Sequence, residues 1–173
     1  MRAAIVSCGL LLAGCRSDIA VSPPAEQQKI PPQLLAAGSF VQMNQTNAAR
    51  YFVSGIYGLE DNAWRWAGRQ AIVKLRLKET EKLKFQMKYA VPRQVIDRNG
   101  PVRLRILFNE KLWEELRYST DGIFEIDKPA PARLLKPDAD NLVTIEIDKP
   151  LPGENGGPEM GFILVHVGFQ PTP

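Results

Sequence analysis

Apolar and polar residues alternate with a period of two through the middle of the chain. In residues 71–78, AIVKLRLK, and again in residues 82–89, KLKFQMKY, an apolar side chain recurs at every second position. Such alternation over eight residues is typical of an antiparallel strand with one buried face. The polar link Glu79-Thr80-Glu81 between the two stretches predicts that they pair as a hairpin.

Six further stretches show short strand-like patterns, and turn-forming pairs such as Asn99-Gly100 and Asp121-Gly122 separate them. The stretches are residues 49–56, 102–108, 112–119, 122–126, 142–147 and 162–169. Because no stretch shows a convincing helical pattern, the sequence predicts an all-β fold. We expect an antiparallel β-sandwich, jelly-roll-like, with about eight strands over residues 38–173.

The chain begins with one basic residue, Arg2, followed by apolar and small residues up to Gly14. This layout is typical of a secretory signal peptide, and the apolar run is too short to cross a bilayer. We therefore expect a signal peptide over residues 1–14 that is absent from the mature protein. A proline-rich stretch follows, so residues 15–37 are predicted to be an extended tether.

The end of the leader, Leu12-Ala13-Gly14-Cys15, resembles the lipobox of bacterial lipoproteins. The resemblance implies cleavage just before Cys15 and a covalent diacylglycerol and acyl lipid on that residue, which anchors the protein in a membrane of the cell envelope. Since Arg16 and Ser17 follow instead of Asp, it favours the outer membrane of a Gram-negative host, facing the periplasm or the surface. Cys15 is then the single cysteine of the mature chain, so no internal disulfide can form.

Two elements of the predicted sandwich resemble a second group of proteins. The first is Gly55-Ile56-Tyr57-Gly58-Leu59-Glu60 with Trp64-Arg65-Trp66, and the second runs from Gly157 to Leu164. Similar elements frame the jelly-roll, carbohydrate-binding-module-like domains associated with surface-polysaccharide glycosyltransferases and phosphoglycerol transferases. The resemblance covers about 115 residues, roughly the length of one ordinary domain, and it implies the same fold for them.

The densest group of candidate ligand-binding side chains consists of Tyr57, Glu60, Trp64 and Arg65. Aromatic rings stack on the C–H faces of sugars, while carboxylate and guanidinium groups bind sugar hydroxyls. This group is therefore a candidate glycan-binding site. A structural role is the alternative, in which Trp66 packs in the sandwich and Glu60 pairs with Arg65. Since the two tryptophans flank Arg65, we expect one to point inward and the other outward.

A second candidate surface lies on the polar side of the hairpin predicted over residues 71–89. This basic surface consists of Lys74, Arg76, Lys84 and Lys88. It would suit anionic glycans, lipopolysaccharide phosphates or lipid headgroups, and Arg103 and Arg105 would extend it. The alternative is a solvated face that acidic residues of neighbouring strands neutralise, namely Glu125, Asp127 or Glu146.

Charge and residue type exclude several other functions. The formal net charge of +3 gives no reason to expect nucleic-acid binding. His166 is the single histidine, and neither a catalytic triad nor a phosphate-binding glycine loop is recognisable. The turn with Asp138, Asp140 and Asn141 carries oxygen ligands that suit Ca²⁺, but such turns are common without metal. We expect no metal site, no cofactor other than the lipid on Cys15, and no enzyme activity.

Two functions are favoured for the folded part, and a third, weaker alternative is an enzyme that uses carboxylates in loops, with Glu60 and Glu115 as the residues to test. The first is non-catalytic binding of an envelope or surface polysaccharide by a lipid-anchored protein. The alternative is a structural or scaffolding lipoprotein that docks another envelope protein or an export complex. An exposed tryptophan that responds to glycan would favour the first, whereas an exposed apolar patch would favour the second.

Overall fold

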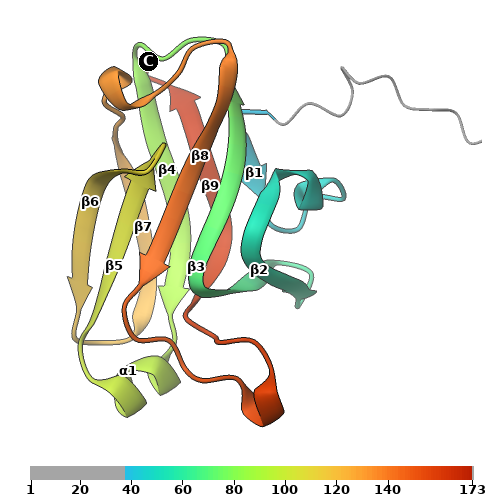
Figure 1. Ribbon diagram of the computed structural model, residues 1–173, viewed down its shortest axis with the longest axis vertical. Coiled ribbons are helices and arrows are strands. Elements are labelled where there is room, and N and C mark those ends of the chain that lie inside the picture. Colours follow the sequence, from blue (N-terminus) through green and yellow to red (C-terminus); the bar gives the residue numbers. More distant parts are fainter. Residues whose placement is uncertain (1–37, 173) are drawn as a thin grey trace, which may run out of the picture. The chain divides into compact units, whose positions relative to one another are not determined.

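The computed structural model describes residues 38–172, which fold into an antiparallel β-structure with one short α-helix (Figure 1). The predicted signal peptide and tether, including Cys15, lie outside the described residues. No helix within residues 38–172 is long and apolar enough to cross a membrane.

Nine strands are present among the described residues, joined by one α-helix and three short 3₁₀ helices. The strands are β1 (Phe40–Gln42), β2 (Phe52–Glu60), β3 (Trp64–Leu77), β4 (Leu83–Val91), β5 (Val102–Phe108), β6 (Lys111–Tyr118), β7 (Gly122–Pro129), β8 (Ala139–Ile147) and β9 (Phe162–Pro171). The helices are η2 (Ala48–Tyr51), α1 (Arg93–Asn99), η3 (Ala132–Leu134) and η4 (Glu154–Gly156).

The strands form one curled sheet in the order β6-β5-β8-β3-β9-β4-β7, with β1 added to β9 and β2 added to β3. Its two halves face each other across a common apolar core. Phe85 of β4 contacts Phe108 of β5 with ring centroids 5.1 Å apart, although these strands share no backbone ladder. Phe169 of β9 joins the same cluster. The predicted antiparallel β-sandwich is therefore confirmed, with nine strands in place of about eight.

The ninth strand is β1, which has only three residues and is too short to show a periodic pattern. The helix α1 was not expected either. Its seven residues are also too few for a 3.6-residue period, but Pro92 precedes it and Gly100, with φ of 68°, ends it. Proline at the start and glycine just after the end are ordinary helix boundary signals.

The predicted hairpin over residues 71–89 is wrong. Strands β3 and β4 do not pair, because β9 lies between them and forms ladders with both. Strands two positions apart in a sheet are about 10 Å from each other, a distance that the link from Lys78 to Lys82 spans easily. Alternation showed correctly that each strand has one buried face, but it carries no information about the neighbouring strand.

Candidate functional site

The predicted aromatic group lies on the hairpin formed by β2 and β3. The turn contains Asp61 and Asn62, both with positive φ, of 48° and 52°. Two consecutive residues with positive φ match the twist of a tight hairpin, and Asp and Asn tolerate this conformation well. The hairpin brings Glu60 opposite Trp64 in the ladder. The hairpin thus brings the residues of this group close together, as the sequence predicts.

Trp64 and Trp66 lie side by side on one face of β3, with ring centroids 5.9 Å apart at an interplanar angle of 81°. Both rings are partly buried. The expectation that one tryptophan points inward and the other outward is wrong, because residues i and i+2 of a strand share a face. The edge-to-face contact between the two rings fixes the orientation of both.

Arg65 makes several contacts within the protein. Its Nε donates a hydrogen bond to the carbonyl of Met43 (2.9 Å), and one terminal nitrogen donates to the carbonyl of Tyr57 (3.0 Å). Its guanidinium also lies over the ring of Phe52, 5.2 Å from the centroid. Arg65 therefore joins β3 to β2 and to the segment after β1. Glu60 is exposed, and Arg65 makes no ion pair with it within residues 38–172.

Tyr57 packs closely against β3 at a glycine. A Cβ atom added to Gly68 would lie 2.5 Å from the Tyr57 hydroxyl oxygen and 3.4 Å from the carbonyl oxygen of Glu159. A side chain at position 68 would therefore have to displace the Tyr57 hydroxyl, whereas glycine leaves room for it. The four predicted ligand-binding residues are therefore neighbours in space, but Tyr57 and Arg65 are used for packing and for hydrogen bonds within the protein.

An open hollow of about 430 Å³ lies beside this hairpin, and we call it the Trp66 hollow. It is lined by Trp66, Gln94, Leu151, Pro152, Gly153, Gly157, Pro158 and Met160. Two backbone hydrogen bonds between Leu151 and Met160, of 2.8 and 3.0 Å, close the base of the loop over residues 148–161. Its run of glycines and prolines was the available signal, but nothing in it indicated which tryptophan it would meet.

The four basic-surface residues lie beside acidic residues from strands that the sequence could not place. Lys74 and Arg76 of β3 pair with Asp140 of β8, at 3.9 and 3.5 Å. On β4, Lys84 pairs with Asp127 of β7 at 3.0 Å. Hydrogen bonds from Gln86 and Lys84 hold the pKa of the Asp127 carboxyl below its usual value.

Lys88, the fourth basic-surface residue, lies opposite Glu125 of β7 on one side and His166 of β9 on the other. His166 contacts the ring of Phe40, with centroids 5.2 Å apart. Burial lowers the pKa of His166. The basic residues of β3 and β4 are thus divided between separate mixed-charge ladders, and they do not form one uniform positive face.

A second open hollow, of about 380 Å³, lies on the outer face of β3, β8, β5 and β6, and we call it the arginine hollow. It is lined by Arg69, Gln70, Arg103, Arg105, Glu115, Glu146, Ile147 and Asp148. One cross-strand row runs from Gln70 through Glu146 and Arg105 to Glu115, as the ladder registers show. Gln70 donates to one oxygen of Glu146 at 2.9 Å, and Arg105 contacts the other at 3.3 Å.

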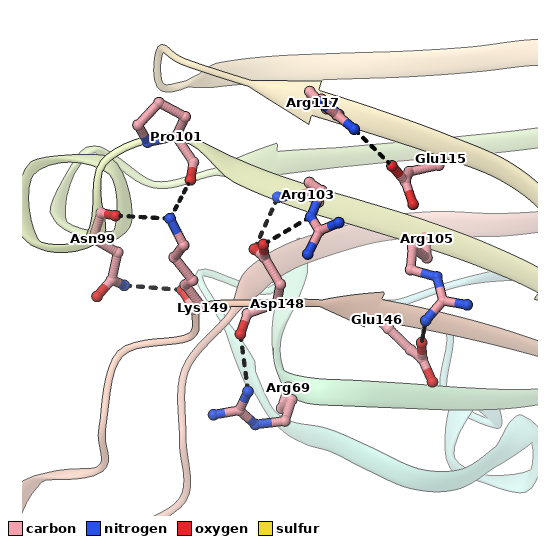
Figure 2. Close-up of polar contacts among 10 residues, drawn as sticks. All are labelled: Arg69, Asn99, Pro101, Arg103, Arg105, Glu115, Arg117, Glu146, Asp148 and Lys149. Carbon is pink, nitrogen blue, oxygen red and sulfur yellow. Dashed lines mark hydrogen bonds and ion pairs between the residues drawn. The ribbon is translucent and has the colours of Figure 1, made fainter.

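The next row of the arginine hollow is held together by Asp148 (Figure 2). Its carboxylate accepts hydrogen bonds from the backbone N–H of Arg103 (2.8 Å) and from Arg103 Nε (3.2 Å). Its backbone carbonyl accepts one from Arg69 at 2.9 Å. Arg69 also pairs with Glu159 through two nitrogens, each 3.0 Å from a carboxylate oxygen. This ion pair separates the two hollows, because Pro158 and Met160, on either side of Glu159, line the Trp66 hollow.

The turn considered for Ca²⁺ is stabilised by the protein itself. Asn141 is fully buried, and its side-chain oxygen accepts hydrogen bonds from the Asn109 amide (2.8 Å) and from the backbone N–H of Lys136 (2.7 Å). Its amide group donates to the carbonyls of Lys136 and Ala139. Within residues 38–172, no group of three or more His, Cys, Asp or Glu side chains is placed to hold a metal ion.

No protein-family model matches the chain, and no curated protein matches it. A family 35 carbohydrate binding module from an environmental isolate is similar over 77% of this chain and 96% of its own, with 13% identity and a TM-score of 0.43. A family GH115 4-O-methyl-alpha-glucuronidase with specificity for decorated arabinogalactans is similar over 64% of this chain, with 9% identity and a TM-score of 0.39. An acetyl xylan esterase from the rumen bacterium Butyrivibrio proteoclasticus is similar over 80%, with 9% identity and a TM-score of 0.38. The chain spans only 14% and 34% of the lengths of these two enzymes.

Proposed function

We propose that this chain is a lipid-anchored protein of a bacterial cell envelope whose β-sandwich binds polysaccharide without catalysis. The observation that carries the polysaccharide part is the Trp66 hollow. It places a partly buried indole ring in an open depression whose loop wall is braced by its own hydrogen bonds. The lipid anchor and the envelope location rest on the sequence Leu12-Ala13-Gly14-Cys15.

The chemistry of the Trp66 hollow suits one or two sugar units. A sugar ring has an apolar C–H face and a rim of hydroxyl groups, so it matches an aromatic face beside hydrogen-bonding groups. Trp66 supplies the aromatic face, and Gln94 supplies an amide that both donates and accepts. Binding hollows of this kind are mostly apolar with a few polar groups, and they are formed before the ligand arrives.

Glu159, the carboxylate beside the Trp66 hollow, is paired with Arg69, and this pairing favours a binding role over a catalytic one. Glu159 accepts two hydrogen bonds from Arg69, which neutralise it and fix its position. A glycoside hydrolase instead needs two carboxyl groups placed on either side of the bond to be cleaved. We therefore propose a binding role for this hollow.

A protein-docking role is the second candidate, and one observation favours it. Four of the lining residues are Leu151, Pro152, Pro158 and Met160, which would also suit an apolar side chain of a partner. The experiment below separates the two roles, because a docking protein would not respond to polysaccharide.

We would test the full chain by electrophoresis through gels that contain dextran, galactomannan, xylan or the surface polysaccharide of the host cell. One of these is expected to retard the chain and to change its tryptophan emission. Trp66→Ala is expected to weaken binding about fivefold or more, because an aromatic stack contributes roughly 1 kcal/mol beyond burial. Trp66→Phe should keep part of the affinity.

The control for this experiment is Leu112→Ala on β6, which removes a side chain that is 49% exposed and does not line the Trp66 hollow. It should bind as the unaltered chain does. Retardation by none of the polysaccharides would contradict the proposal and move the choice to protein docking. Retardation that Trp66→Ala leaves unchanged would show that the Trp66 hollow is not the site.

A further inference from the structure

We propose that the arginine hollow binds an oxyanion, a carboxylate, sulfate or phosphate group carried by the polysaccharide. The ligand of the whole protein would then be an acidic polysaccharide. This inference rests on the proposed polysaccharide binding, but it concerns a different hollow and different residues. Its support is the number, placement and incomplete pairing of the guanidinium groups.

Like charges are crowded on the outer face of β5 and β6. Arg103 lies directly opposite Arg117 in the ladder of these two strands. Arg105 follows two residues later on the same face as Arg103. Like charges directly opposite one another destabilise a sheet, and Asp148 and Glu115 offset this repulsion through exposed ion pairs with Arg103 and Arg117.

The ion pairs of these arginines leave most of each guanidinium group available. Arg103 uses Nε on Asp148, Arg105 uses one terminal nitrogen on Glu146, and Arg117 uses one on Glu115 (Figure 2). The other guanidinium nitrogens of these three side chains have no hydrogen-bond partner within residues 38–172. The three side chains are also 44–76% exposed, so their ion pairs are weak and a ligand can compete with them.

Guanidinium forks match oxyanions well. Each fork can donate two parallel hydrogen bonds to one carboxylate, sulfate or phosphate group. Four carboxylates, Glu115, Glu146, Asp148 and Glu159, balance the four arginines of this region. Recognition must therefore come from directional hydrogen bonds, because the region has no net charge that would attract anions from a distance.

A polymer could reach both hollows. Along β3, Gln70 of the arginine hollow lies four positions after Trp66, which corresponds to about 13 Å in an extended strand. The Arg69–Glu159 ion pair lies between the two hollows. A chain of several sugars that crosses this ion pair could stack one unit on Trp66 and place an acidic substituent against Arg103 and Arg105.

The test compares acidic probes with neutral partners of the same backbone, using the full chain. The pairs are polygalacturonate against its methyl ester, dextran sulfate against dextran, and phosphatidylglycerol vesicles against phosphatidylcholine vesicles. The vesicles separate a lipid phosphate from an acid carried by a polysaccharide. At least one acidic polysaccharide is expected to bind about tenfold more tightly than its neutral partner.

Arg103→Gln combined with Arg105→Gln should remove this preference. Arg105→Lys should lose most of it as well, since lysine keeps the charge but not the fork. The matched control, Arg133→Gln with Lys78→Gln, removes the same charge from exposed positions outside the arginine hollow and should keep the preference.

Three results would overturn the inference. Equal binding of acidic and neutral partners would do so, and with Trp66-dependent binding intact it would leave the proposed function standing. An equal loss of the acidic preference in the control variant would show that the preference comes from overall charge and not from the arginine hollow. Binding of acidic vesicles without acidic polysaccharide would assign the hollow to lipid phosphate. Failure of every polysaccharide to bind would instead reject the proposed function itself.

Discussion

At the scale of single residues, arginines of this chain serve two distinct purposes. Arg65 directs its guanidinium at two backbone carbonyls and at an aromatic ring, so it fixes strands relative to one another. Arg105 has one exposed ion pair with Glu146 and keeps its other donors available. The type of residue is the same, and only its contacts show which arginine can serve a ligand.

A pair of tyrosines in the core makes stability depend on alkaline pH. Tyr89 is fully buried, and its hydroxyl shares a hydrogen bond with that of Tyr118. Burial raises the pKa of both phenols in the folded protein. A raised pKa in the folded state means that this contribution to stability is complete below the unfolded value near pH 10 and is lost as the pH rises above it. We expect the free energy of unfolding to fall by about 1 kcal/mol or more between pH 8 and pH 11.

Urea denaturation at pH 8, 10 and 11 measures this dependence. The double variant Tyr89→Phe with Tyr118→Phe should show a flatter profile, because it has no phenol to ionise at that place. Phe124→Leu is the control, since the Phe124 ring packs 4.2 Å from that of Tyr118 but does not titrate. It should lower stability at every pH and keep the slope. An unchanged slope in the double variant would show that other groups cause the alkaline loss.

At the scale of elements, the sequence predicted where the strands lie along the chain far better than which strands pair with each other. The stretch 102–108 is β5 at the same bounds, and 162 is the first residue of β9. The first half of β3 was missed, because Ala67 and Gly68 are both buried and interrupt the alternation. Pairing failed at the predicted hairpin, since the strand between β3 and β4 comes last in the sequence. The Trp66 hollow could not be predicted for the same reason, because its other wall is a loop about ninety residues further along the chain.

The bend of β2 against β3 depends on one glycine. Gly55 has a φ of +71°, and a Cβ atom placed there would lie 1.7 Å from the carbonyl oxygen of Gln70. The ladder register shifts at this point, which marks a β-bulge. Gly55→Ala is expected to cost about 3 kcal/mol of unfolding free energy, through backbone strain and the clash.

Gly58→Ala on the same strand is the matched control, because its Cβ would meet no atom within 4 Å. Its effect should stay within about 0.5 kcal/mol. Urea denaturation of both variants measures the difference. If the two variants were equally stable, the bulge could form without glycine. The close approach of β2 to Gln70 would then not require glycine at position 55.

At the scale of the whole molecule, the lipid anchor and the two hollows are separate proposals that concern different parts of the chain. The proposed function needs both, because the anchor would hold the sandwich near the membrane while the hollows bind polysaccharide. Twenty-two residues lie between Cys15 and Gly38 in the sequence. A fully extended stretch of that length reaches at most about 80 Å, which sets the largest distance between the lipid and the sandwich. A polysaccharide bound by the sandwich would therefore stay within this distance of the membrane in which the lipid is inserted.

The lipid anchor can be tested with the two cysteines of the chain, Cys8 and Cys15. In the host cell, the full chain is expected to incorporate labelled palmitate and to sediment with membranes. Cys15→Ser should abolish both, because its hydroxyl cannot replace the thiolate as the nucleophile that accepts the lipid. Cys8→Ser should change neither, since Cys8 lies in the part of the leader that is expected to be removed. Palmitate label that survives Cys15→Ser, or that disappears in Cys8→Ser, would contradict lipidation at Cys15. A single lipid chain binds membranes only marginally, so the stable sedimentation expected here depends on the two acyl chains of the diacylglycerol group that the lipoprotein resemblance implies.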